Sequence, residues 1–396
     1  MSIVNHKITG YNITMKKSTL IVQAGIAHDA AHKSVIPPIY LSSTFEMDGI
    51  GEHSKYEYSR TKNPTRDELA NAITELEGGV GACVTSSGMA ALTLIIHLLN
   101  PDDLLIAPFD CYGRSYRLLC ALSEKGHFKL KFINQYDADE VRQSFKANPK
   151  MVLIESPSNP VMRIADIKNI ATQAKSCGAM TVCDNTFLSP MLQQPLELGA
   201  DISFHSTTKF INGHGDVVGG CVVTNDSDIL TDLEFWANSL GLIGAPFDSY
   251  MTLRGMRTLE LRITRAQENA MKIAEMLDAH EMVSAVYYPA LKSHPNHDIA
   301  RAQQSGFGAM LSFDVKGDIG NVKKFVDRLE IFRLAQSLGG TESLINHPAT
   351  MTHVSMGEEA RAKAGVTDNL LRLSVGIEHM DDLLNDLNSA LKHIGN

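Results

Sequence analysis

The sequence predicts an α/β fold, in which a large, mostly parallel sheet domain is followed by a smaller C-terminal α+β domain. Three observations lead to this class. Short apolar runs bounded by turn residues are separated by helical stretches, as in sheets that helices cover on both faces. One long amphipathic stretch spans residues 257–280, and the segments beyond it alternate in the period-two manner of half-buried strands. The length of 396 residues allows about two or three domains.

The chain divides into three expected regions. Residues 1–63 show little periodicity and contain Pro37-Pro38, so we expect an extended arm there. Residues 64–255 should form the large domain, and residues 256–396 the small one, whose sheet we expect to have one open face. The expected helices are 64–78, 86–100 and 257–280, and the expected strands are 103–108, 151–157, 179–185, 201–206, 306–315 and 370–378.

Composition and charge exclude several classes of function. The formal charge is -9, from 36 basic and 45 acidic residues, so we expect no nucleic-acid partner. No run approaches the ~18 apolar residues of a membrane helix, so we expect no membrane span. The six cysteines form no C-x-x-C pair, which suits reduced thiols in the cytoplasm. His294 and His297 lie in a loop where histidines are ordinarily solvated, so we predict no metal site.

Polar residues follow the short apolar run Ala82-Cys83-Val84 and two of the expected strands, 179–185 and 201–206. Ligands of α/β proteins bind at the carboxyl ends of parallel strands, so these residues are the candidates for a site. The turn at residues 85–88, Thr-Ser-Ser-Gly, opens a helix whose free N–H groups suit a phosphate. Asp184 ends the run at 179–185, and Lys209 follows two or three hydroxyl residues at the end of the run at 201–206.

Each of these features has an ordinary explanation when taken alone. The turn suits a small-residue N-cap, Asp184 suits a helix cap, and Lys209 suits a solvated surface lysine. Together they provide a carboxylate for a pyridine nitrogen, a lysine for an aldehyde and a cradle for a phosphate. This combination indicates the cofactor pyridoxal 5'-phosphate (PLP).

Further motifs occur from about Leu20 to the C-terminus. They are Tyr58-Ser59-Arg60, Asn63-Pro64-Thr65-Arg66, Ser87-Gly88-Met89-Ala90, Asp110-Cys111-Tyr112-Gly113, Tyr116-Arg117-Leu118, Glu155-Ser156-Pro157-Ser158-Asn159-Pro160, Asp184-Asn185-Thr186-Phe187, His205-Ser206-Thr207-Thr208-Lys209, Phe247-Asp248-Ser249-Tyr250, Leu253-Arg254-Gly255, Ser337-Leu338-Gly339-Gly340, Met351-Thr352-His353 and Leu371-Arg372-Leu373-Ser374-Val375-Gly376. With these motifs the chain resembles the Cys/Met-metabolism family of PLP enzymes. The resemblance implies PLP fold type I, like that of aspartate aminotransferase.

The resemblance implies three catalytic residues. Lys209 is expected to form a Schiff base with the cofactor and to move protons, which requires a neutral amine. Asp184 is expected to keep the ring nitrogen protonated, so that the ring accepts electrons. Tyr112 is expected to stack on the ring, and its hydroxyl to assist proton transfer.

The resemblance also implies which residues bind the cofactor phosphate. The expected ligands from the same chain are Gly88, Met89, Ser206 and Thr208. Tyr58 and Arg60 are expected to reach the phosphate from a neighbouring subunit. The protein is therefore expected to be a homo-oligomer, at least a dimer and, by family resemblance, a tetramer.

The expected substrates are small amino acids. Arg372 is the candidate for binding the α-carboxylate, because a guanidinium matches a carboxylate with two hydrogen bonds, and it faces away from Leu371 and Leu373. Asn159 matches a family position at the cofactor, and Ser337 one at the amino-acid carboxylate. Two further residues are Arg117, a candidate for a succinyl carboxylate or for a helix-face ion pair, and Gln336, which stands where many relatives carry glutamate.

Within the family, the segments at 110–117, 235–238 and 247–250 look most like bacterial cystathionine γ-synthases. That group catalyses γ-replacement on an O-acyl-L-homoserine, succinyl or acetyl, with cysteine. Two departures leave alternatives open: Thr61 replaces an arginine that would contact a distal carboxylate, and Gln336 lacks a charge that could hold incoming cysteine. The alternatives are another thiol nucleophile, an O-acylhomoserine sulfhydrylase, or a cystathionine or methionine γ-lyase that forms 2-oxobutanoate.

A non-enzymatic role, as a regulator or scaffold that retains the fold, is the remaining alternative. A chain that had lost catalysis would be expected to lack at least one of the acid, the lysine and the arginine. Asp184, Lys209 and Arg372 are all present, so we expect an enzyme.

Overall fold

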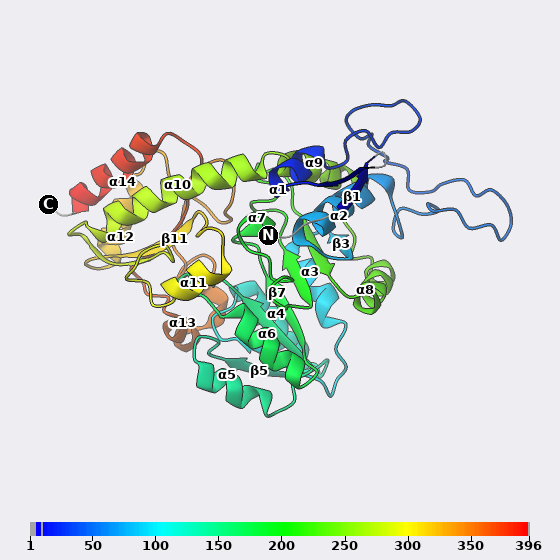
Figure 1. The fold of residues 1–396 in the computed structure, drawn as a ribbon. Helices are drawn as coiled ribbons and strands as arrows, with labels where there is room; N and C mark the ends of the chain where they lie inside the picture. The colour runs from blue at the N-terminus through cyan, green and yellow to red at the C-terminus, as the bar shows by residue number, and fades with distance from the viewer. Residues whose placement is uncertain (1–4, 9–10, 395–396) are drawn as a thin grey trace.

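A seven-stranded sheet forms the centre of the large domain (Figure 1). The computed structural model describes residues 5–8 and 11–394. The strands of the sheet are β3 (Gly81–Thr85), β4 (Leu104–Pro108), β5 (Lys129–Ile133), β6 (Met151–Glu155), β7 (Met180–Asp184), β8 (Ile202–His205) and β9 (Gly220–Thr224). Their order is β3-β9-β8-β7-β6-β4-β5, and β9 runs antiparallel to both of its neighbours. The predicted α/β class with a mostly parallel sheet is confirmed.

Helices pack on both faces of this sheet. Side chains of β9 alternate between the two faces: Cys221 and Val223 pack in the core that contains Ile73 of the second helix, whereas Val222 packs in the core that contains Leu92 of the third. The helices of this domain are α2 (Pro64–Glu77), α3 (Gly88–Ile96), α4 (Gly113–Glu124), α5 (Ala138–Phe145), α6 (Ile167–Ser176), α7 (Ser189–Leu192), α8 (Ser227–Leu240) and α9 (Pro246–Met256). None of the helices in the described part of the chain has the length and apolar character needed to cross a bilayer.

A five-stranded sheet forms the second domain. Its strands are β10 (Val283–Tyr287), β11 (Met310–Val315), β12 (Arg333–Leu334), β13 (Leu344–Asn346) and β14 (Leu370–Ser374), in the order β10-β11-β14-β13-β12. The accompanying helices are α10 (Leu259–Asp278), α11 (His297–Gln303), α12 (Ile319–Asp327), α13 (Glu358–Ala364), α14 (Met380–Ile394) and the short 3-10 helix Val354–Met356. The long helix α10 runs along the top of the molecule from one domain to the other (Figure 1).

The expectation that the small sheet has one open face is wrong. Every residue of β11 and β14 is buried. Leu371 and Leu373 pack into the hydrophobic core, while Arg372 and Ser312 on the opposite face hydrogen-bond to loops of the large domain. The polar face that the sequence pattern indicated is therefore covered by a second polar surface rather than by solvent.

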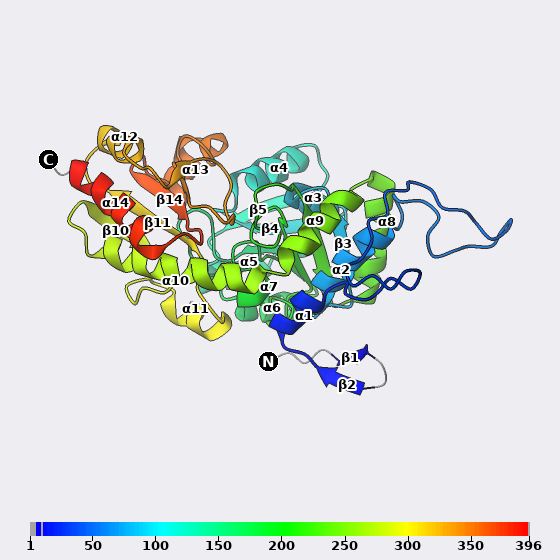
Figure 2. The ribbon, with the colours of Figure 1, turned by 90° about the horizontal axis from the view of Figure 1, so that it is seen from above.

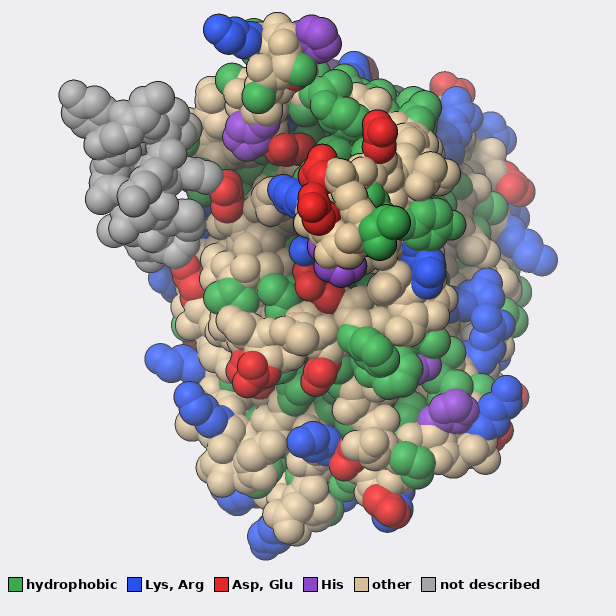
Figure 3. Space-filling model, turned by 90° about the vertical axis from the view of Figure 1, so that its right-hand side faces the viewer, with side chains coloured by type: hydrophobic (Ala, Val, Ile, Leu, Met, Phe, Trp, Pro, Cys, Tyr) green, Lys and Arg blue, Asp and Glu red, His purple; other side chains and the backbone are tan. Residues whose placement is uncertain are grey.

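The region before α2 is largely irregular. It also contains a hairpin of β1 (Asn5–Ile8) and β2 (Tyr11–Thr14), and helix α1 (Lys17–Gln23), which buries Leu20 and Ile21. Between α1 and α2, loops stand away from the rest of the molecule in both views (Figures 1 and 2). Ile50 in these loops is fully exposed, and hydrophobic side chains lie among polar ones on this side of the molecule (Figure 3).

A buried arginine ties α10 to the loop that follows β8. Arg262 donates hydrogen bonds from Nη1 to the Phe210 carbonyl at 2.8 Å and from Nη2 to the Gly255 carbonyl at 2.9 Å. Gly213 has a φ of 71°, and a Cβ atom there would lie 1.8 Å from Arg262 Nη1. Because Phe210 directly follows Lys209, this contact positions the candidate lysine.

We predict that Arg262→Met lowers the free energy of unfolding by about 3 kcal/mol, because it leaves buried carbonyl groups without their charged donor. Thermal and urea denaturation measure this loss. Arg265→Met, an exposed position on the same helix, is the matched control. Equal stability of the two variants would contradict the prediction.

Candidate active site

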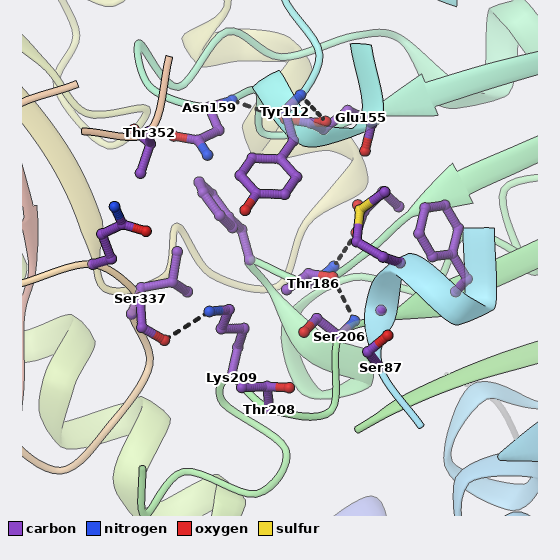
Figure 4. A pocket seen from close by; sticks show the side chains of 18 of the residues that line it. Ser87, Tyr112, Glu155, Asn159, Thr186, Ser206, Thr208, Lys209, Ser337 and Thr352 are labelled. Atoms are coloured by element: carbon purple, nitrogen blue, oxygen red, sulfur yellow. Dashed lines mark hydrogen bonds between the residues drawn. The ribbon is translucent and has the colours of Figure 1, made fainter. Parts of the chain in front are cut away.

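A cavity of about 400 Å³ lies where β6, β7 and β8 end, and loops of the second domain line its other side (Figure 4). The cavity brings together most residues that the sequence singled out. These are Gly88, Met89, Tyr112, Asn159, Asp184, Ser206, Thr208 and Lys209 from the large domain, and Gln336, Ser337 and Arg372 from the small one.

One wall of the cavity is a cradle for an anion. The helix α3 begins at Gly88, and the Ser87 hydroxyl caps it by accepting a hydrogen bond from the Ala90 N–H at 3.0 Å. A Cβ atom on Gly88 would lie 2.7 Å from Cβ of Ser206, so only glycine lets the helix approach the turn after β8 this closely. The first turn of a helix leaves N–H groups without intrahelical partners, and with the hydroxyls of Ser206 and Thr208 these suit a phosphate.

Asp184 is a buried carboxylate at the end of β7. Burial raises its pKa, whereas hydrogen bonds from Thr186 and the electrostatic interaction with His205 lower it. The Thr186 N–H donates to Asp184 Oδ1 at 3.0 Å, and the Thr186 hydroxyl accepts from the Ser206 N–H at 2.9 Å. A cation beside Asp184, such as a protonated ring nitrogen, would favour its ionised form.

Lys209 reaches into the cavity from the turn after β8. Its Nζ donates to the Ser337 hydroxyl at 2.6 Å (Figure 4). Burial, and then the charge of Arg372, lower the pKa of Lys209 from 10.5 to about 8, so a usable fraction of the amine is neutral near neutral pH. Ser337 has a φ of 88°, a left-handed conformation that is uncommon for residues other than glycine and costs energy to hold at a site.

Tyr112 and a buried glutamate occupy the side of the cavity beside β6. Glu155 Oε2 accepts a hydrogen bond from the Tyr112 N–H at 2.8 Å, and its Oε1 accepts from the Asn159 N–H at 3.1 Å. Burial and the neighbouring Asp184 raise the pKa of Glu155 well above its usual range. Glu155 therefore holds two loops of the cavity in place, and the Tyr112 ring projects into the space (Figure 4).

Arg372 presents a guanidinium to the cavity from β14. Its Nη1 donates to Asn159 Oδ1 at 2.8 Å and its Nη2 to the Ser337 carbonyl at 3.0 Å. Its Nε is buried and has no hydrogen-bond partner among the described residues. Burial lowers the pKa of Arg372 to about 10, so it stays cationic at neutral pH and suits a carboxylate.

Three residues singled out by the sequence do not line this cavity. Tyr58 is about half exposed on the arm, and Arg60 donates from Nη1 to the Asn238 carbonyl at 2.8 Å. Arg117 is exposed on α4. Their expected contacts, with a neighbouring subunit's cofactor and with a succinyl group, therefore remain predictions.

Sequence reasoning missed the roles of Glu155 and Thr186. The signal for Glu155 was present, because it ends an apolar run just as Asp184 ends another. Glu155 and Asp184 are aligned on neighbouring parallel strands, which brings the two carboxylates to one edge of the sheet. Thr186 gave no such signal, because its hydroxyl becomes a bridge only once β7 and β8 are neighbours.

The residues present fit PLP. One cavity contains a lysine with a lowered pKa, a buried carboxylate and an anion cradle. These groups match the aldehyde, the ring nitrogen and the phosphate of PLP, in that order. The glycine at position 88 supports this fit, because it brings the helix terminus against Ser206.

Comparisons with known proteins agree with this assignment. Residues 18–392 match the family model described as Cys/Met metabolism PLP-dependent enzyme. The chain is 49% identical to cystathionine gamma-synthase of Escherichia coli, over 96% of this chain and 99% of that protein. It is 44% identical to cystathionine gamma-lyase of Bacillus subtilis, over 96% of this chain and 100% of that protein.

A solved structure has the same fold. The crystal structure of cystathionine gamma synthase from Xanthomonas oryzae pv. oryzae superposes with a TM-score of 0.96 at 52% sequence identity, covering 97% of this chain and 99% of that chain. The match extends over both domains and the cavity between them. The chain belongs to the Cys/Met metabolism family of PLP-dependent enzymes.

Proposed function

We propose that the protein is a cytoplasmic transferase of the cystathionine γ-synthase type. It replaces the acyloxy group of an O-acyl-L-homoserine, succinyl or acetyl, with the sulfur of cysteine, in methionine biosynthesis. The observation that carries this proposal is the 52% identity and TM-score of 0.96 to the Xanthomonas oryzae synthase, whose structure is described in complex with aminoacrylate and cysteine. The free state of all six cysteines suits a cytoplasmic location.

The side chains of the cavity divide the work of this reaction. PLP, when bound, supplies an electron-accepting ring that stabilises negative charge at the substrate Cα. Arg372 binds the substrate α-carboxylate, and the neutral form of Lys209 accepts the Cα proton at its Nζ. Asp184 would keep the ring nitrogen of the cofactor protonated, and the Tyr112 ring would pack against the cofactor.

The overall reaction balances as a substitution at Cγ. The bond between Cγ and the ester oxygen breaks, and the acyl group leaves as a carboxylate. The sulfur of cysteine forms a bond to the same carbon, and its thiol proton is released. Lys209 is the group placed to move protons between Cα and Cβ during this exchange, because it is the lysine of the cavity and its pKa is about 8.

Gln336 favours a second candidate, γ-elimination. Its uncharged amide lines the cavity, so it offers no negative charge to the ammonium group of incoming cysteine. Without a bound nucleophile, the same substrate yields 2-oxobutanoate and ammonia after hydrolysis. The 44% identity to a gamma-lyase supports this candidate.

The proposed enzyme is a homo-oligomer, at least a dimer and by resemblance a tetramer. Tyr58 and Arg60 of one subunit would contact the cofactor phosphate of its neighbour. Two observations support this arrangement: neither side chain lines the cavity of its own chain, and the arm exposes apolar residues such as Ile50 and Leu41.

Product analysis by mass spectrometry tests the proposed reaction. We expect O-succinyl- or O-acetylhomoserine with cysteine to give the thioether, and neither ester to react with Lys209→Ala, which lacks the proton acceptor. If 2-oxobutanoate dominates even at high cysteine concentration, γ-elimination is the reaction and the transferase proposal is wrong.

Substitution of the arginine tests carboxylate binding. Arg372→Lys should raise KM for the amino-acid substrate about 10- to 100-fold, because lysine cannot make two parallel hydrogen bonds to a carboxylate. Steady-state kinetics measure the change. Arg301→Lys, an exposed position on α11, is the control, and a KM equal in the two variants would exclude the assigned role.

The lowered pKa of Lys209 predicts how cofactor uptake depends on pH. Only the neutral amine attacks the PLP aldehyde, so the rate at which apoenzyme binds PLP should rise with pH up to about 8 and level off above it. Stopped-flow absorbance measures this rate. N-acetyl-lysine in the same buffers corrects for ionisations of PLP itself, and a midpoint near 10.5 for the protein would contradict the lowered pKa.

A further inference from the structure

A buried glutamate behind the cavity has no part in the reaction above. Glu77, the last residue of α2, is fully buried. Its Oε1 accepts hydrogen bonds from His205 Nε2 at 2.5 Å, from the Ser203 hydroxyl at 2.8 Å and from Asn185 Nδ2 at 3.2 Å. These three partners are also fully buried. Burial of a carboxylate away from water costs free energy, and the hydrogen bonds to these three partners offset that cost.

All three partners adjoin residues that line the cavity. Asp184 and Phe204 are aligned across β7 and β8, and both line the cavity. Successive side chains of a strand point to opposite faces, so Asn185 and His205, the next residues, face away from it. His205 is aligned with Cys221 of β9, which packs in the same core as α2.

Hydrogen bonds therefore hold the ends of β7 and β8 from both faces of the sheet. On the cavity side, Thr186 accepts from the Ser206 N–H and donates to Asp184 Oδ1. On the far side, Glu77 joins the two residues next to Asp184 and Ser206. The contacts close a ring around the two strand ends.

We infer that Glu77 is a positioning residue for PLP, which fixes the spacing between Asp184 and Ser206 from the far side of the sheet. The spacing matters because the nitrogen and the phosphate of PLP are separated by a rigid ring, so their two partners must lie at a matching separation. The inference rests on the proposed roles of Asp184 and Ser206, and it holds for any reaction of the family.

Glu77→Gln tests the inference, because glutamine keeps the shape of the side chain and removes its charge. At metal sites, loss of a residue that orients a metal ligand through a hydrogen bond lowers metal affinity about 10- to 100-fold. Because Glu77 would orient the partners of PLP in the same way, we expect PLP to bind Glu77→Gln about tenfold more weakly. Titration of apoenzyme with PLP measures the affinity. The phosphorus NMR signal of the bound phosphate should also move, which a loss of stability alone would not cause.

Asp386→Asn is the matched control. Asp386 is likewise a buried carboxylate that accepts three hydrogen bonds, from the N–H groups of Glu330, Ile331 and Phe332, but it lies in the second domain away from the cavity. We expect this variant to lose stability and to bind PLP like the wild type. Asn185→Ala removes one contact of Glu77 and should weaken PLP binding in the same direction, which provides a second test if Glu77→Gln does not fold.

Ser206→Ala separates the possible failures. One result would overturn only the inference about Glu77: PLP binds Ser206→Ala more weakly, whereas Glu77→Gln and Asn185→Ala keep the wild-type affinity and phosphorus signal. Unchanged PLP binding in Ser206→Ala would overturn the proposed role of Ser206 and the inference with it. Neither result depends on the product analysis, so failure of the proposed reaction is distinguishable from both.

Discussion

The hydrogen bond between Arg372 and Asn159 is the contact on which the site depends, because it joins the two domains within the cavity itself. A guanidinium taken out of water needs partners for its N–H groups, and Arg372 finds them in Asn159 and in the Ser337 carbonyl. Ser337 in turn accepts the hydrogen bond of Lys209. The small domain thus supplies Arg372, the proposed carboxylate-binding group, and contacts Lys209, the proposed proton acceptor.

Much of the site could be predicted because it lies at strand ends. An apolar run followed by a polar residue marks the place where a buried strand reaches the sheet edge, and this placed Asp184 and the turn before Lys209 correctly. The alternation in 370–376 likewise placed Arg372 opposite Leu371 and Leu373. Local sequence patterns were enough to predict a side chain's position where that position depends on a single strand.

Tertiary contacts account for what the sequence left unresolved. No local pattern shows that Glu77, at the end of a helix, meets Asn185 and His205 across more than a hundred residues. The buried polar face of β14 was mistaken for an open one, because alternation reports polarity and not what covers it. Arg117 is exposed on α4 and lies outside the cavity, so its proposed contact with a succinyl group stays a prediction.

The close approach at Gly88 limits how this protein can change under mutation. A side chain at that position would meet not only Cβ of Ser206 but also its backbone Cα at 3.0 Å, so no replacement at position 206 relieves the clash. Moving α3 instead would disturb Ala91, Leu94 and Ile95, which are fully buried. A substitution of Gly88 therefore cannot be compensated by a second substitution at Ser206. Libraries for directed evolution gain more from varying Gln336 and Thr352, which line the opposite wall of the cavity.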